Sequence, residues 1–267
     1  GALYIDSSNN QFKVEECDFQ DLYAVDGGAI YVNVANGVEI LGGSKGNKFL
    51  SCRATGEGVI YIAKAQSINI ENTELSGVNI TGVASDGVVV IKSKEDSEAN
   101  AFSCGINVKD LTIKDYTTAS KGGVVVDFQG YASAEATFEG IVVSNVCAQG
   151  EGSLGGAMSL DGNIKATIYD GVFTSNYADN GGVVYANGAE VSMENVEFSS
   201  NCTSQSASLN RDINGAILYA NNSNIFIKDA TISGTVLAVN GSLITLDGVG
   251  EVNFDNIEFV NNTCYSQ

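Results

Sequence analysis

The chain has 267 residues, and 32 acidic residues against 13 basic ones give it a formal net charge of −19 at neutral pH. It contains no histidine. The acidity argues against nucleic-acid binding, which needs a basic surface to neutralise phosphates. The lack of histidine excludes serine or cysteine nucleophiles that an imidazole would activate.

A short phrase recurs along the chain: one or two small residues, then three or four apolar residues, often ending in tyrosine. Nine copies begin at Gly1, Gly28, Gly58, Gly87, Gly123, Gly156, Gly182, Ala216 and Thr235. Repeats of about 20 to 50 residues are typical of solenoids, propellers and arrays. We therefore predict a single elongated domain over residues 1–267, either a mature product or an excerpt of a longer solenoid, with each copy as the first strand of a coil.

The residues after each first strand alternate apolar and polar, as in Ile68-Asn69-Ile70-Glu71. Such alternation predicts a second strand with one buried face. Five residues after its last inward residue comes another apolar residue, which starts a third strand. Two positions after the last inward residue of the second strand, most coils carry a residue type that tolerates a left-handed backbone. These residues are Asn72, Asp110, Gly140, Asp170, Asn195, Asp229 and Asn256, with Glu16 in the first coil. We predict a sharp turn at each.

Three short strands in each of about nine coils, with no helical crossover, predict an all-β parallel β-helix. Stacked in register at about 4.8 Å, nine coils would form a rod of about 40 Å.

The sequence also resembles a known group of proteins. Gly-Gly-Ala-Ile at residues 27–30 is similar to one half of the paired repeat of polymorphic outer-membrane proteins, and Phe173…Asn176, Phe198…Asn201 and Phe259…Asn262 are similar to the Phe-x-x-Asn half. The wider group is the pectin-lyase-like proteins. The resemblance implies a right-handed parallel β-helix and a role in adhesion or surface structure.

The first strands are apolar on both faces. Their second and fourth positions, such as Ile30 and Val32, are predicted to point inward. The outward positions carry no charge, and we expect seven of them to form an interface: Tyr4, Tyr31, Tyr61, Val90, Val126, Tyr185 and Tyr219. Large exposed apolar patches mark interfaces, and tyrosine is favoured there. A covering loop and plain β-propensity are the alternative explanations.

Polysaccharide lyases of this shape use an arginine or lysine base, and hydrolases use paired aspartates. Here the only arginines are Arg53 and Arg211, both in expected loops, and no Asp-Asp pair occurs. Three acidic residues, Asp26, Glu57 and Asp86, precede the glycines of successive coils. If stacked they would repel, which a Ca²⁺ ion would relieve; the alternative is a solvated acidic corner without an ion.

In a secreted chain an even number of cysteines suggests disulfides, and sequons are glycosylated only on a eukaryotic secretory route. Adjacent coils hold two candidate disulfides, Cys17–Cys52 and Cys104–Cys147, although a buried free thiol is the alternative for Cys17. Five Asn-x-Ser/Thr sequons are candidate glycosylation sites: Asn79, Asn201, Asn221, Asn240 and Asn261.

Together these features predict a non-enzymatic structural module of a cell-surface or filament assembly, without membrane insertion in this segment. We expect it to associate with copies of itself through the tyrosine-bearing face and end to end. The alternatives are a carbohydrate-binding adhesin that uses the tyrosines and, less favoured, a polysaccharide lyase or hydrolase.

Overall fold

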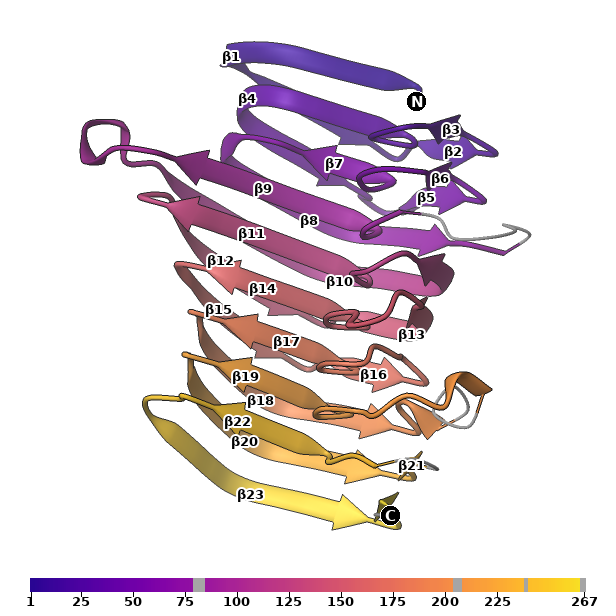
Figure 1. Ribbon diagram of the computed structural model, residues 1–267. Helices are drawn as coiled ribbons and strands as arrows, with labels where there is room; N and C mark the ends of the chain where they lie inside the picture. Colours follow the sequence, from indigo (N-terminus) through magenta and orange to yellow (C-terminus); the bar gives the residue numbers. More distant parts are fainter. Residues whose placement is uncertain (79–84, 204–207, 238–239, 265–267) are drawn as a thin grey trace.

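The computed structural model describes residues 1–78, 85–203, 208–237 and 240–264. It is an all-β parallel solenoid of about eight turns, with 64% strand and 2% helix. Coils descend from the N-terminus to the C-terminus, and every coil contacts the coils directly above and below it (Figure 1). The prediction of an all-β parallel solenoid is confirmed.

The first-strand ladder runs the length of the stack. Its members, each parallel to the next, are β1 (Leu3–Glu15), β4 (Ile30–Leu41), β7 (Ile60–Ile62), β9 (Val89–Glu95), β11 (Val124–Gly130), β14 (Met158–Gly162), β17 (Val184–Asn187), β19 (Leu218–Asn221) and β22 (Ile244–Asp247).

The second and third strands form two further ladders. The second-strand ladder continues from β1 and β4 through β8 (Ala65–Ser76), β10 (Ser103–Thr118), β12 (Ser133–Glu139), β15 (Ile164–Tyr169), β18 (Glu190–Ser199), β20 (Asn224–Ser233) and β23 (Val252–Val260). The third-strand ladder consists of β2 (Asp18–Gln20), β5 (Asn47–Leu50), β13 (Val142–Ala148), β16 (Val172–Thr174) and the last residues of β8, β10, β18, β20 and β23.

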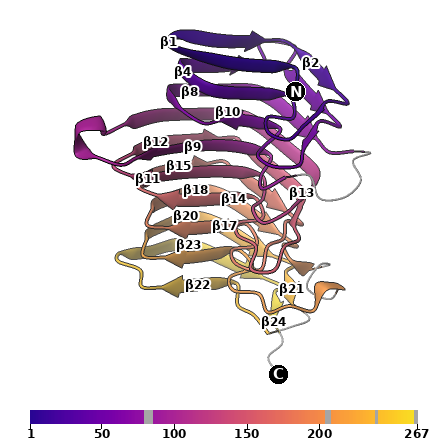
Figure 2. The same ribbon diagram turned by 45° about the horizontal axis from the view of Figure 1, so that its top comes forward.

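Short elements lie in the connections between the strands of the three ladders. Strand β3 (Tyr23–Ala24) pairs with β6 (Arg53–Ala54), and β21 (Val236–Leu237) pairs with β24 (Thr263–Cys264). The 3₁₀-helix η1 (Glu98–Asn100) lies in the connection between β9 and β10, which projects from the stack in both views (Figures 1 and 2).

The prediction that the ninth first strand begins at Thr235 was wrong. Val236 and Leu237 form β21, which pairs with β24 beyond the third-strand ladder. The true ninth first strand is β22, in which Ile244 pairs with Leu218 and Thr245 with Tyr219. It opens with Ser242-Leu243, whereas most of the other copies open with Gly-Ala or Gly-Val, and this difference hid it. Nine first strands leave eight steps between them, and the stack therefore makes about eight turns rather than nine.

The core is built from columns of inward side chains, one residue from each coil. In the first-strand ladder Ile30, Ile60 and Val89 stack in register and are almost completely buried. Two aromatic pairs stack in the same way, Phe19 on Phe49 and Phe173 on Phe198, with ring centroids 4.6 and 5.4 Å apart. Parallel in-register stacking keeps like residues adjacent, so the core is continuous from coil to coil.

The predicted turn between the second and third strands is confirmed. The backbone φ is positive at all eight positions: Glu16, Asn72, Asp110, Gly140, Asp170, Asn195, Asp229 and Asn256. Their side chains bond along the ladder: Nδ2 of Asn195 donates to Asp170 and Nδ2 of Asn256 donates to Asp229. The bond from Asn256 is the main reason that the pKa of Asp229 lies below its usual value.

A second corner, which the sequence analysis missed, ends the third strands. Positive φ recurs there at Asp21, Ser51, Asp115, Asn145, Ser175, Ser200, Gly234 and Asn261. Each stands two residues after an inward third-strand residue, in the same kind of pattern that revealed the first corner. These residue types tolerate a left-handed backbone better than β-branched ones, which accounts for their place here.

The asparagines of the Phe-x-x-Asn motif hold this second corner together. Asn201 is fully buried; its Oδ1 accepts from the Asn176 backbone N–H at 2.8 Å and its Nδ2 donates to the Phe173 carbonyl at 2.9 Å. Asn176 and Asn262 repeat both bonds to their own preceding coils. The motif thus satisfies backbone groups that the bend removes from the ladders.

Candidate functional site

The tyrosines that we predicted to share a face do stack in a column. Tyr4, Tyr31 and Tyr61 are consecutive in the first-strand ladder, and their ring centroids lie 5.2 and 5.0 Å apart. Further down, Tyr185 and Tyr219 stack with centroids 5.7 Å apart. We call the outward positions of this ladder the tyrosine column: Tyr4, Tyr31, Tyr61, Val90, Val125, Ser159, Tyr185 and Tyr219.

One predicted interface residue, Val126, does not belong to the column. Val125 pairs with Val90 and with Ser159, whereas Val126 pairs with Ile91 and is buried in the core. Because two glycines, Gly122 and Gly123, precede a run of three valines, the sequence analysis assigned this strand one residue out of register. Such a slip exchanges the two faces of a strand.

The turn that enters each first strand partly covers the tyrosine column. Gly87 bends against it: a Cβ built there would lie 2.7 Å from Cγ2 of Val90 and 2.8 Å from Cγ2 of Val125. Val90, Val125 and Ser159 are therefore buried, and the tyrosines other than Tyr4 are half-buried. The continuous exposed apolar face that we expected is thus absent among the described residues.

Burial also changes the chemistry of these phenols. Burial, and next the charge of Glu57, raises the pKa of Tyr61 to about 12. Burial likewise raises the pKa of Tyr31 and of Tyr185. The phenols consequently stay neutral at physiological pH and act here as packing groups with a polar tip.

A polar ladder beside the tyrosine column was not foreseen. Asn187 donates through Nδ2 to Oδ1 of Asp161, and Asn221 donates to Oδ1 of Asn187, both at 2.9 Å. Asp127 and Asp247 extend the same register position above and below. The signal was present in the sequence as an Asn or Asp two residues after the outward position of several first strands.

The three carboxylates proposed for calcium do not share one register position. Because Ile30 pairs with Ile60 and Ile60 with Val89, Glu57 and Asp86 are level with each other, whereas Asp26 precedes their position by one residue. Lys92 forms an ion pair with Glu57, and Oδ1 of Asp26 accepts from the Glu57 backbone N–H at 2.8 Å. No cluster of three or more metal-ligating side chains occurs in the part of the chain that the structure describes. Calcium binding stays a prediction.

Both candidate disulfides were wrong. All six cysteines are described, and all are free thiols. Cys17 is level with Asn47, whose Oδ1 accepts from its N–H, and Cys52 lies five residues further along that coil. Cys104 is level with Ala134 at the start of the second strand, far from Cys147 at the end of a third strand. These separations exceed the roughly 7 Å between Cα atoms that a disulfide spans.

The sequons have different surroundings. Asn79 lies outside the described residues. The prediction of glycosylation at Asn201 was wrong, because its side-chain amide is buried and forms two hydrogen bonds. Asn221 is half-buried in the polar ladder, and Asn240 and Asn261 are exposed.

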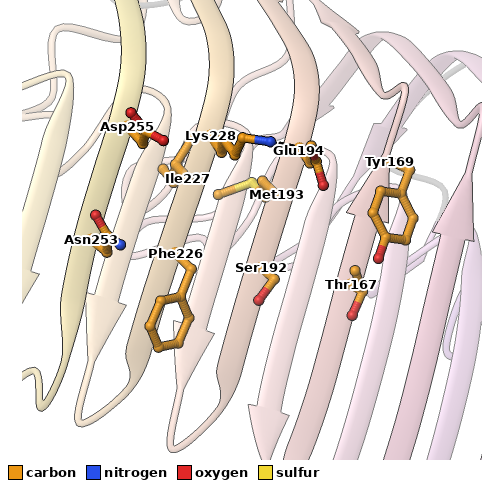
Figure 3. Close-up of a pocket in the computed structure, with 10 residues that line it drawn as sticks. All are labelled: Thr167, Tyr169, Ser192, Met193, Glu194, Phe226, Ile227, Lys228, Asn253 and Asp255. Carbon is orange, nitrogen blue, oxygen red and sulfur yellow. Dashed lines mark hydrogen bonds and ion pairs between the residues drawn. The ribbon is translucent and has the colours of Figure 1, made fainter.

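A shallow groove crosses the outer face of the second-strand ladder near its C-terminal end, with a volume of about 350 Å³. Two aromatic side chains border it, the Phe226 ring and, on β15, Tyr169, which is 41% exposed (Figure 3). Glu194 and Lys228 pair at 2.7 Å on the same face. The positions in register with Phe226 on the other coils are polar, and those in register with Tyr169 are all charged except Leu41.

The most unusual surface lies at the bottom of the stack. We call it the end face, and it consists of the inward side chains of the last coil: Ile244, Leu246, Val252, Phe254, Ile257 and Phe259. Phe254 is 42% and Phe259 is 56% exposed, although their column neighbours Ile227 and Ile232 are buried. Among the described residues, no coil lies below these side chains.

No protein family, curated protein or solved structure matches this chain in the comparisons that we made. The structure contains no helix, among the described residues, that is long and apolar enough to span a membrane. Its function must therefore be argued from the surfaces described above.

Proposed function

We propose that the chain is a structural module of an extracellular surface or filament assembly, in which coils continue end to end. The end face carries this proposal. Complete burial of a large apolar side chain stabilises a protein by about 1.5–3 kcal/mol, so a further coil below the end face, from the same polypeptide or from a second copy, would be stabilising. Strand β23 pairs with β20 on one edge, and its other edge is a template for a further parallel strand.

The N-terminal coil of a second copy fits below the end face, and a further coil of the same polypeptide would fit there in the same way. Val14 opens the column that Phe254 closes, and Phe19 opens the column that Phe259 closes. Phe19 and Phe12, like the end face, are not fully buried within their own coil. A second copy stacked below would place apolar on apolar and add one more step of about 4.8 Å to each ladder.

The tyrosine column contributes less to the proposal than the sequence suggested. Its middle three positions are buried by the turns that enter the first strands. Side-by-side association through this face therefore rests on the tyrosines at its two ends, of which Tyr4 is exposed and the others are half-buried. We favour axial stacking as the main contact.

A non-catalytic role is supported by the arginines. Arg53 lies 5.0 Å above the centre of the Tyr23 ring. Nη1 of Arg211 lies 3.0 Å from Oδ2 of the buried Asp179, and Nη2 donates to the Gln149 carbonyl. Both guanidinium groups thus have structural partners.

The test is light scattering and electron microscopy of the 267-residue chain in about 1 M salt, where surface charge is screened. We expect rods longer than one solenoid. Phe254→Lys with Phe259→Lys should yield single rods, whereas Tyr169→Lys, an equally exposed aromatic outside the end face, should assemble like the native chain. Equal assembly of the end-face variant would rule out axial stacking through this surface, and circular dichroism confirms that each variant is folded.

A second candidate is carbohydrate binding in the groove of Figure 3. Aromatic rings with neighbouring amide and carboxylate groups suit sugar rings, which present apolar faces and hydroxyl edges. Phe226 interrupts an otherwise polar column, with Asn253 as its neighbour on β23. Retention on a glycan panel that Phe226→Ala abolishes, with assembly unchanged, would support this function, and a panel without retention would reject it.

A further inference from the structure

We propose that Tyr185 and Tyr219 form an oxidative cross-linking site, at which a one-electron oxidant couples their rings into dityrosine and so joins two neighbouring coils covalently. The inference concerns a single chain and does not depend on the assembly of copies. It follows from the stacking of the two rings, their exposure and their neighbours in the tyrosine column.

The two rings are held face to face by the ladder that carries them. Tyr185 on β17 pairs with Tyr219 on β19, and their ring centroids lie 5.7 Å apart with 6° between the ring planes. Two residues along the same strands, Asn221 donates to Asn187 at 2.9 Å, which fixes the register of the pair. The rings therefore stay together as long as the two coils are stacked.

The turns that enter the two strands give both rings the same surroundings. Gly181 and Gly215 have φ values of 64° and 69°. A side chain on either glycine would clash with the carbonyl of the residue just before the tyrosine, because the turn bends back over the strand. Both rings are half-buried. Solvent and small oxidants thus reach them from one side, while the turns limit the approach of a tyrosine from another chain.

Neither ring has a second tyrosine beside it. Ser159 is in register with Tyr185 on the coil above, and Thr245 is in register with Tyr219 on the coil below. Aliphatic hydroxyls are much harder to oxidise than phenols and do not couple to phenoxyl radicals. A radical on either tyrosine therefore has one partner within the column, and its coupling gives a single product.

The opposite end of the tyrosine column is less selective. Tyr31 stacks between Tyr4 and Tyr61, with ring centroids 5.2 and 5.0 Å apart. A radical on Tyr31 has two partners, and we expect a mixture of links there. The pair on β17 and β19 is consequently the one that decides the inference.

The coupling balances with hydrogen peroxide as the terminal oxidant. A peroxidase takes one electron from each phenol, and each phenol releases its proton to water, which leaves two phenoxyl radicals. A carbon–carbon bond then forms between ring carbons next to the phenol oxygens, and the hydrogen on each of these carbons moves as a proton to the oxygen of its own ring. Overall, two tyrosines and one hydrogen peroxide give one dityrosine and two water molecules.

Proximity favours this pair over pairs between chains. A partner fixed on the neighbouring coil acts at an effective concentration far above that of a dilute second chain. The stacked rings must turn about their side-chain bonds until the two carbons meet, and the solvent side of the column leaves room for this. The new bond would restrict the unfolded chain in the way that a disulfide does.

The experiment oxidises the dilute native chain with a peroxidase and hydrogen peroxide, after iodoacetamide has blocked the exposed thiols. Peptide mass spectrometry should find Tyr185 joined to Tyr219 with the loss of two hydrogens. Tyr169 is exposed, and its ring stacks on no other ring in the described part of the chain. Links at Tyr169 should therefore be roughly tenfold rarer.

Two variants separate the pair from tyrosine oxidation in general. Tyr185→Phe keeps the ring stack but has no phenol to oxidise, and the peptide linked to Tyr219 should disappear. Tyr169→Phe makes the same change outside the column and should leave the yield of the linked peptide unchanged. Loss of the product in both variants would contradict the inference, and circular dichroism confirms that each variant is folded.

Heavy-nitrogen labelling distinguishes links within a chain from links between chains. An equal mixture of light and heavy chains should give only light–light and heavy–heavy peptides, and mixed peptides as the main product would overturn the inference. A ruthenium photo-oxidant provides a second, smaller oxidant. No linked peptide with either oxidant, or an equal yield from the chain unfolded in urea, would also rule the site out. None of these outcomes bears on axial stacking, which particle length tests separately.

Discussion

Phe259 pairs in register with Ile232, yet Phe259 is 56% exposed while Ile232 is completely buried. The two side chains occupy the same core column one coil apart and point the same way. Among the described residues, a coil lies below Ile232 and none lies below Phe259. This relationship underlies the proposal that the last coil is a docking surface.

The buried asparagines should contribute strongly to stability. Asn201→Ala removes the partners of a backbone N–H at Asn176 and a carbonyl at Phe173. A buried polar group left without a partner costs about 1–3 kcal/mol, so we expect a loss of about 2–4 kcal/mol in the free energy of unfolding, measured by urea denaturation. Asn163→Ala, at an exposed position, is the matched control. A loss at Asn201 no larger than the control would contradict the assigned role.

The first corner should accept glycine and reject β-branched residues. Asp110 has a φ of 51°. A left-handed backbone costs an ordinary side chain about 1–2 kcal/mol, and glycine almost nothing. Asp110→Val should therefore destabilise the chain by at least 1 kcal/mol relative to Asp110→Gly. Thermal unfolding of the two variants side by side provides the comparison, and equal stability would argue against a left-handed residue at this corner.

The ion pair of Asp179 and Arg211 should hold the loop between residues 148 and 157. Asp179 accepts from the Gly152 N–H and from the Tyr177 hydroxyl as well as from Arg211. Arg211→Ala leaves a buried carboxylate without its cation, which typically costs about 3–5 kcal/mol. Since Arg211 is partly exposed, we expect the lower end of that range.

Hydrogen exchange locates this effect. Protection should fall at residues 150–155 in Arg211→Ala and recover in part when Asp179→Asn removes the unpaired charge as well. If the double variant is no more protected than the single one, the ion pair is not what orders the loop.

The cysteines should react in order of exposure. Burial raises the pKa of Cys104 and of Cys202 to about 12 and that of Cys147 to about 11. Thiolate is the reactive form, so at pH 8 these thiols are almost entirely protonated and inert. Iodoacetamide labelling followed by mass spectrometry should modify the exposed Cys264 first in the folded chain. Cys104, Cys147 and Cys202 should label at rates comparable to Cys264 only after unfolding, and fast labelling in the folded chain would contradict their burial.

The sequence predicted the parts of the fold that depend on a strict pattern. Period-two alternation and the Asn, Asp or Gly two residues later revealed the second strand and the first corner, because a left-handed residue there restricts the side chain directly. The first strand was harder: it is apolar on both faces, so nothing in the pattern fixed its register at Val125 and Val126. The same ambiguity placed a ninth first strand at Thr235.

The candidate site was less predictable for a physical reason. Exposure depends on what lies against a side chain, and the sequence does not show that Gly87 bends over Val90 or that Phe226 and Tyr169 border one groove. The end face could not be predicted, because the position of Phe254 in its column requires the register of every coil above it.

The most direct test of axial stacking is the length of the particles formed by the native chain in 1 M salt, seen by electron microscopy. The account predicts rods several times longer than the roughly 40 Å of one solenoid, with the strand spacing of about 4.8 Å continuous along their axis. Isolated rods of single-solenoid length, in a chain shown by circular dichroism to be folded, would contradict it.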